Sequence, residues 1–159
     1  MDARLNLFGH PVALKTLKYL TSAHNAVAGS TLPASTAELV RLRASQINGC
    51  GFCTDMHTKE AVHAGESEVR LHLVAAWREA TVFTEAERAA LEIAEQGTRI
   101  ADAAGGVTDE AWENAAKHFD EDQLAALAAT IAIINAFNRM NVIVKLPTAG
   151  DYVAGQPLL

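Results

Sequence analysis

The chain has 159 residues, of which 50% are apolar and only 6% aromatic, and its formal net charge is −6. This length fits one domain, and a chain of this size buries roughly 70% of its unfolded surface, so it needs no disulfide to fold. The negative charge argues against nucleic acid or an anionic membrane as the main partner. We expect a single domain over residues 1–159 that binds neither.

The N-terminal residues do not combine a basic segment with a continuous apolar one, so no signal peptide is predicted. The longest apolar stretch, Leu124 to Phe137, is interrupted by Thr130 and Asn135. It is too short to span a bilayer and predicts a buried helix. We therefore expect a cytoplasmic protein, in which a disulfide is usually catalytic or transient rather than structural.

Helical spacing of apolar residues recurs along the chain, and no segment shows a convincing period of two. The predicted helices cover about residues 12–28, 35–47, 50–64, 67–80, 84–100, 108–118 and 122–142. The expected fold class is all-α, with six to seven helices and no sheet. The tail after Pro147 is expected to be irregular.

Capping residues support several of these boundaries. Ser67, Thr84 and Thr108 can each accept a backbone N–H at a helix start, and Thr84 opens a capping-box pattern. Asn48-Gly49 and Gly65 are typical of helix ends.

The segment from Leu124 to Phe137 is apolar on nearly every side, which a small monomer can seldom hide. An oligomer interface is one explanation, and a central position in the core is the other. Asn135, Asn138 and Arg139 form a polar stripe within or beside this segment. They can pair with other helices, face an interface, or lie on a solvated face.

The chain contains two cysteines, Cys50 and Cys53, in a C-x-x-C arrangement that His57 follows. On a helix that begins near Cys50, Cys53 and His57 lie one turn apart on the same face. The N–H groups of the first helical turn stabilise a thiolate, and a histidine can accept a thiol proton or protonate a leaving group. This pattern predicts thiol redox chemistry.

Attack of one thiolate on a peroxide would give a sulfenic acid, which the second cysteine converts to a disulfide that a reductant must reopen. The spacing alone does not decide which sulfur attacks first. Cys53 is favoured because His57 lies one turn away.

Other interpretations of the cysteine pair remain open. A zinc site would have three ligands with His57, and His63 lies on another face. Two inert buried cysteines and a metal-trafficking site are further alternatives. A thioredoxin fold is disfavoured because no βαβ pattern surrounds the motif. The remaining histidines are expected to be surface or packed residues, namely His10, His24, His63, His72 and His118.

Glu38 lies on the preceding predicted helix and, taken alone, would be an exposed carboxylate paired with Arg41. The segment from Glu38 to Cys53, ELVRLRASQINGCGFC, followed by His57, closely resembles the core motif of the alkylhydroperoxidase D-like proteins. These proteins belong to the carboxymuconolactone decarboxylase superfamily. The motif core covers about residues 38–57, and its spacing of glutamate, two cysteines and histidine is specific.

Two further segments, Phe83–Leu91 and Ile134–Arg139, are similar to downstream segments of a compact branch of the superfamily. The resemblance implies an all-helical fold, a trimer or a hexamer, and peroxidase activity on organic hydroperoxides. It also implies roles for four residues: Cys53 attacks the peroxide, Cys50 resolves, and His57 and Glu38 relay protons. No metal or organic cofactor is implied, and a lipoyl- or thioredoxin-type reductant would restore the thiols.

Phe52 departs from the motif, because the best-known members carry a histidine immediately before the second cysteine. The decarboxylase branch characteristically lacks the cysteine pair, which disfavours decarboxylation. A protein disulfide reductase or redox-sensing module is the main alternative function, and a non-redox lyase is a weaker one.

Overall fold

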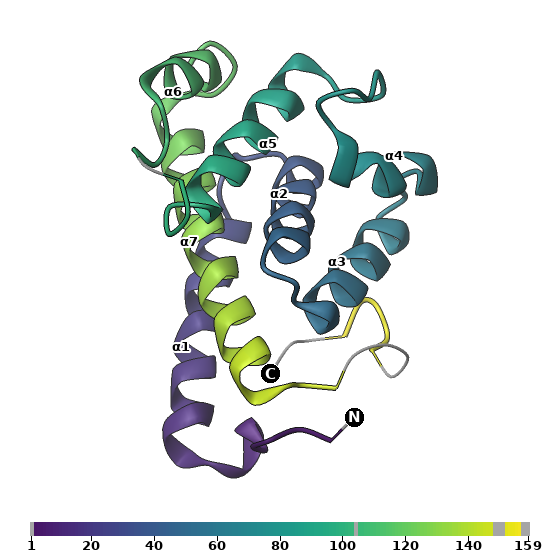
Figure 1. The fold of residues 1–159 in the computed structure, drawn as a ribbon, viewed down its shortest axis with the longest axis vertical. Coiled ribbons are helices and arrows are strands. Elements are labelled where there is room, and N and C mark those ends of the chain that lie inside the picture. The colour runs from purple at the N-terminus through teal and green to yellow at the C-terminus, as the bar shows by residue number, and fades with distance from the viewer. Residues whose placement is uncertain (1, 104, 148–151, 157–159) are drawn as a thin grey trace.

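Seven α-helices and two short 3-10 helices make up the regular structure of the computed structural model, which describes residues 2–103, 105–147 and 152–156 (Figure 1). No strand occurs within these ranges, so the prediction of an all-α fold is confirmed. The elements are η1 (Leu7–Gly9), α1 (Pro11–Ala28), α2 (Ala34–Ile47), α3 (Gly51–His63), α4 (Glu68–Leu73), η2 (Val74–Ala76), α5 (Glu85–Thr98), α6 (Asp109–Ala115) and α7 (Glu121–Val144).

The order of the helices is as predicted, but the helix expected over residues 67–80 is wrong in its second half. It ends at Leu73 and continues only as the 3-10 turn η2. The carbonyls of Trp77 and Ala80 accept hydrogen bonds from the Arg88 guanidinium, so a side chain replaces the helical N–H donors there. α5 and α6 also end two and three residues before the predicted boundaries.

Two of the three predicted N-caps are confirmed. The hydroxyls of Thr84 and Thr108 each accept a backbone N–H in the first turn, and Thr84 completes a capping box. Ser67 occupies the N-cap position of α4, but its side chain makes no capping hydrogen bond, and its own N–H donates to Glu66. α7 begins with a capping box at Asp120 that the sequence analysis missed.

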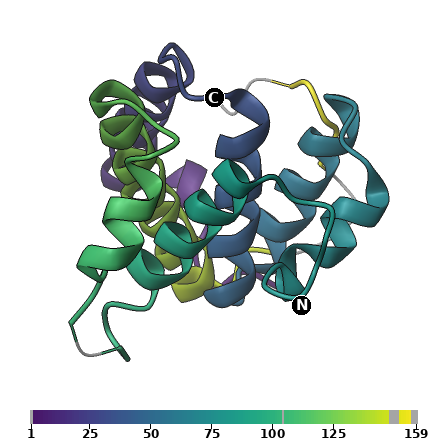
Figure 2. The same ribbon diagram turned by 90° about the horizontal axis from the view of Figure 1, so that it is seen from above.

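α2 is the central helix and packs against α3, α5 and α7, between α3 and α7 (Figures 1 and 2). α7 packs in turn against α1, α2 and α5. Contacts with three helices account for the buried part of the apolar Leu124–Phe137 segment, whereas Ala125, Ala128 and Ala132 are exposed. The alternative, an oligomer interface, stays a prediction.

By length and composition alone, α7 is the one helix in the described ranges that could cross a membrane. At 24 residues it is longer than the apolar stretch from which a short buried helix was predicted. A core helix can have the same length and composition, and α7 packs against three other helices, although only 39% of its apolar window is buried.

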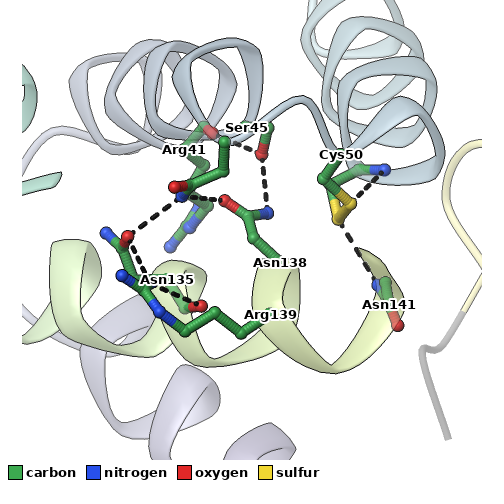
Figure 3. Close-up of a disulfide and its surroundings, with 9 residues drawn as sticks. Arg41, Ser45, Cys50, Asn135, Asn138, Arg139 and Asn141 are labelled. Carbon is green, nitrogen blue, oxygen red and sulfur yellow. Dashed lines mark hydrogen bonds between the residues drawn. A yellow bond between two sulfur atoms is a disulfide. The ribbon is translucent and has the colours of Figure 1, made fainter. Parts of the chain in front are cut away.

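The polar stripe of α7 pairs with the C-terminal end of α2. Asn48 donates from Nδ2 to the Oδ1 atoms of Asn135 and Asn138, at 2.9 Å in both cases. Asn138 Nδ2 donates to Ser45 Oγ at 3.1 Å, and Arg139 donates to Asn135 Oδ1 at 2.8 Å (Figure 3). Of the three alternatives for this stripe, pairing outside α7 is therefore confirmed for Asn135 and Asn138, whereas Arg139 is exposed and bonds to Asn135 of its own helix. These bonds hold the end of α2, and the turn that follows it, against α7.

The predicted irregular tail is only partly visible. Residues 148–151 and 157–159 lie outside the described residues, and residues 152–156 form neither helix nor strand. This short segment lies against α3, where the Tyr152 hydroxyl and the Gly155 N–H both donate to the Glu60 carboxylate.

Candidate active site

The turn between α2 and α3 sets the position of both cysteines. Gly49 has a φ of +64°, a left-handed conformation that glycine adopts without a steric penalty. The chain then reverses so that the Cys50 N–H donates to the Ser45 carbonyl at 3.0 Å. Cys50 is the N-cap of α3 and Cys53 lies in its first turn. The predicted placement of both cysteines at a helix start is therefore found in the structure.

Cys50 and Cys53 are joined by a disulfide, and their side chains are almost completely buried, at 2% and 1% exposure. Cys50 Sγ accepts the Cys53 N–H at 3.3 Å. Cys53 Sγ accepts from Asn141 Nδ2 at 3.4 Å, across from α7 (Figure 3). Both sulfurs thus have a donor close by, and the same donors would stabilise a thiolate after reduction.

Glu38 and His57 form the second half of the site. His57 Nδ1 lies 2.6 Å from Glu38 Oε1, and Arg41 donates to Glu38 Oε2 at 2.8 Å. Burial favours the neutral acid, but the His57 charge and the hydrogen bonds from His57 and Arg41 outweigh it and lower the pKa of Glu38 to about 2. The expected Glu38–Arg41 pair is confirmed, whereas the expectation that Glu38 is exposed is wrong, because His57 covers its other oxygen.

The ionised Glu38 determines which nitrogen of His57 is available. A carboxylate only accepts hydrogen bonds, so Nδ1 carries a proton and donates it to Glu38. Nε2 is then the nitrogen that gains or loses a proton. It is buried and has no hydrogen-bond partner among the described residues.

A cavity of about 160 Å³ adjoins both His57 and Cys53. Its other walls are mostly apolar side chains from several helices, including Leu17, Phe52, Met56, Ile134 and Phe137. Cavities of this size hold a single benzene ring. The site can therefore hold a small apolar molecule directly beside a sulfur and an imidazole nitrogen.

Cys50 does not line this cavity. It borders a separate groove of about 230 Å³, together with Gly49, Gly51 and Lys145. Phe52 lies between the two spaces and lines both, and its ring meets Tyr152 edge-on, with 6.3 Å between the ring centroids. The two sulfurs of the disulfide thus face different openings.

A third, more polar cavity of about 530 Å³ lies at Glu38 and His57 and is bordered by Tyr152 and Glu60. Burial and the hydrogen bond with Glu60 raise the pKa of Tyr152. Tyr152 therefore stays protonated and donates to Glu60. His57 lines both this polar cavity and the apolar one, whereas Glu38 lines the polar one alone.

The structure brings all four predicted site residues to one place and adds three that the sequence analysis missed. Asn141 arrives from α7, and Thr21 and His24 from α1. His24, which was expected to be a surface or packed residue, lines both cavities that His57 borders. Burial and the nearby positive charge of Arg41 lower the pKa of His24, so its imidazole is neutral at physiological pH. The i, i+3 spacing of Thr21 and His24 shows that they share a helix face, but nothing in the sequence shows what that face meets.

Within the described part of the chain, no group of three or more histidine, cysteine or acidic side chains is arranged to hold a metal ion. Each cysteine sulfur is bonded to the other, and His57 Nδ1 is bonded to Glu38.

Comparisons with protein families and with known proteins both give matches to this chain. Residues 15–96 match the Carboxymuconolactone decarboxylase family. The chain is 35% identical over 133 residues to the uncharacterized protein YdfG of Bacillus subtilis, which covers 84% of this chain and 89% of YdfG.

Among solved structures, the fold is similar to that of ATU0492 from Agrobacterium tumefaciens, a protein of unknown function provisionally described as the antioxidant defence protein AhpD. The TM-score is 0.87 and the identity 35%, with 94% of this chain and all of that chain covered. The debrominase Bmp8 shares the fold at a TM-score of 0.71 and 20% identity, with 81% of this chain and 68% of that chain covered. The chain belongs to the carboxymuconolactone decarboxylase family, as an alkylhydroperoxidase D-like member.

Proposed function

We propose that this protein is a thiol peroxidase that reduces organic hydroperoxides, with Cys53 as the attacking residue and Cys50 as the resolving residue. One observation carries the proposal. Cys53 and His57, whose Nε2 has no hydrogen-bond partner among the described residues, line the same apolar cavity, whereas Cys50 lies outside it. A peroxide with an apolar body can therefore reach the Cys53 sulfur and a proton-transferring group together.

In the reduced enzyme, His57 Nε2 accepts the proton of the Cys53 thiol. The thiolate attacks the terminal oxygen of the hydroperoxide, and the O–O bond breaks. Two electrons pass from sulfur to the peroxide, and Cys53 becomes a sulfenic acid. His57 returns its proton to the departing alkoxide, which leaves as the alcohol.

Cys50 then closes the cycle on the protein. Its sulfur attacks the Cys53 sulfenic acid and forms the disulfide that the structure contains. The Cys50 proton and the displaced hydroxide leave as water. A lipoyl- or thioredoxin-type dithiol supplies the two electrons that reopen the disulfide, and becomes a disulfide itself.

Glu38 acts through His57. Its carboxylate holds Nδ1–H at 2.6 Å, which leaves Nε2 as the nitrogen available for proton transfer and stabilises the imidazolium formed when Cys53 loses its proton. Glu38 is thus a proton-relay and positioning residue rather than a nucleophile.

The assembly and location belong to the same proposal: a trimer or hexamer in the cytoplasm. α1 supports association, because only Leu17 of its 18 residues is buried. Val12 and Tyr19 on this helix are 80% and 63% exposed. An apolar surface of this kind is typical of a helix that meets another subunit.

The alternative of a protein disulfide reductase is less well supported by the geometry. Both cysteines are almost completely buried, so a protein disulfide has little direct access to either sulfur. A non-redox lyase would leave the adjoining disulfide without a role.

The test is hydroperoxide consumption with a dithiol reductant, comparing wild type, Cys53→Ser and Cys50→Ser. Cys53→Ser should abolish turnover, and reduced Cys50→Ser without added dithiol should consume one equivalent without forming an intramolecular disulfide. Intact mass after one equivalent of hydroperoxide should show the wild type losing two hydrogens. Full activity in Cys53→Ser would overturn the proposal. Insulin reduction without peroxide turnover would favour the disulfide reductase.

A further inference from the structure

Thr21, in the middle of α1, has a buried hydroxyl without a hydrogen-bond partner in the described ranges. A hydroxyl on a helix can donate to the carbonyl four residues earlier. Four other helical hydroxyls of this protein do so: Thr16 to Val12, Ser22 to Lys18, Ser45 to Arg41 and Thr130 to Ala126. The Thr21 hydroxyl is therefore free to bind something else.

His57 Nε2 is the other buried side-chain atom that lacks a partner in the described part of the chain. Thr21 and His57 come from different helices, 36 positions apart in the sequence, yet both line the cavity at Cys53 and the polar cavity beside it. A polar atom buried without a hydrogen bond is unfavourable, and two such atoms around one cavity indicate a ligand that supplies their partners.

The other residues that line the cavity at Cys53 limit the size and polarity of the rest of this ligand. Leu17, Met56, Ile134 and Phe137 give the cavity apolar walls, and its volume of about 160 Å³ suits a body near the size of one benzene ring. A fitting ligand thus has a compact apolar body with a small polar group at one end. That polar group must be able to bond with a hydroxyl and an imidazole nitrogen.

We infer that Thr21 is a substrate-binding residue, and that the Thr21 hydroxyl and His57 Nε2 hold the two oxygens of a compact aryl or branched-alkyl hydroperoxide. This inference rests on the proposed peroxidase function. A hydroperoxide offers one O–H donor and two acceptor oxygens, which match a hydroxyl and a proton-exchanging nitrogen. Hydrogen peroxide leaves the apolar walls without contacts, and a long-chain hydroperoxide exceeds the cavity.

The kinetic test compares Thr21→Val, which removes the hydroxyl at nearly constant shape, with Thr21→Ser, which keeps it. Thr16→Val is the matched control, because Thr16 lies on the exposed side of the same helix. With cumene hydroperoxide, Thr21→Val should lower kcat/KM about tenfold, mainly through KM, while Thr21→Ser and Thr16→Val stay near wild type. Wild type should prefer cumene hydroperoxide to hydrogen peroxide and to linoleic acid hydroperoxide.

A binding measurement separates this inference from the proposed function. The oxidised protein is titrated in a calorimeter with 2-phenyl-2-propanol, the alcohol that cumene hydroperoxide would leave, and with cumene, which lacks the hydroxyl. Wild type and Thr21→Ser should bind the alcohol several-fold more tightly than cumene, and Thr21→Val should lose this preference. The inference is overturned if Thr21→Val prefers the alcohol over cumene as strongly as wild type does, or if wild type does not bind the alcohol. Either result counts even if peroxide turnover is normal. Binding as expected without peroxide turnover would contradict the proposed function alone.

Discussion

Glu38 on α2 and His57 on α3 meet at 2.6 Å, although 19 residues separate them in the sequence. Both side chains are largely buried, at 16% and 5% exposure, and Arg41 binds the other oxygen of Glu38. The carboxylate is thus held ionised on one side of the imidazole, while the other side of the imidazole borders the cavity at Cys53. The imidazole proposed to transfer protons is thus held in place by Glu38 without any bound ligand.

The first prediction concerns the removal of this charge. Glu38→Gln should slow hydroperoxide reduction about 10- to 100-fold, because a neutral amide stabilises the His57 imidazolium poorly. The measurement is kcat/KM for an organic hydroperoxide with saturating dithiol. Asp55→Asn is the control, since Asp55 is a carboxylate on α3 that pairs with Lys59 instead of His57. An equal loss in both variants would contradict a specific role for Glu38.

The second prediction is a dependence of stability on pH. The pKa of Glu38 falls from 4.5 to about 2 in the folded state. Between these values the unfolded chain binds more protons than the folded one, so stability rises with pH. The contribution of Glu38 is complete above pH ~4.5 and is lost as the pH falls towards ~2. Urea unfolding from about pH 7 to pH 3 should show a flatter profile for Glu38→Gln than for wild type. If the two profiles are parallel, Glu38 is not the source of this dependence of stability on pH.

The local parts of the site could be predicted from the sequence, because they depend on helical geometry alone. The position of Cys53 relative to His57 follows from a four-residue spacing, and the turn at Gly49 places Cys50 at the start of α3. The contact between Glu38 and His57 depends on how α2 and α3 pack. Only the resemblance to a known family indicated it.

The rest could not be predicted because it is set by contacts between distant segments. Asn141 reaches Cys53 across 88 residues, and Thr21 reaches the cavity from a helix with almost no buried face. A single asparagine or threonine at a helical position has no pattern that distinguishes a site residue from a solvated one. Phe52 is a related case: the motif marked it as a departure, but only the structure shows that it separates the two openings at the disulfide.

The third prediction concerns Asn141, whose Nδ2 donates to Cys53 Sγ at 3.4 Å. Asn141→Leu should raise the pKa of the Cys53 thiol by about one unit, since a hydrogen bond to a charged group contributes about 1.5–3 kcal/mol. The measurement is thiolate absorbance against pH in the reduced Cys50→Ser background, where Cys53 is the remaining thiol. Peroxide reactivity at neutral pH should fall accordingly. Unchanged titration would show that Asn141 does not act on the thiolate.

The fourth prediction concerns Asn138, which is completely buried and joins the end of α2 to α7. It accepts a hydrogen bond from Asn48 and donates one to Ser45, so Asn138→Leu removes both partners at similar volume. The free energy of unfolding in urea should fall by about 2–4 kcal/mol, because Asn48 and the buried Ser45 each lose one hydrogen bond and Asn138 loses its buried contacts. Asn114→Leu, at an exposed position of α6, should change it by less than about 0.5 kcal/mol. The turn that bears Cys50 follows the end of α2 directly, so Asn138→Leu should also speed alkylation of the reduced cysteines. If the cysteines are alkylated as slowly as in wild type, other contacts hold the turn.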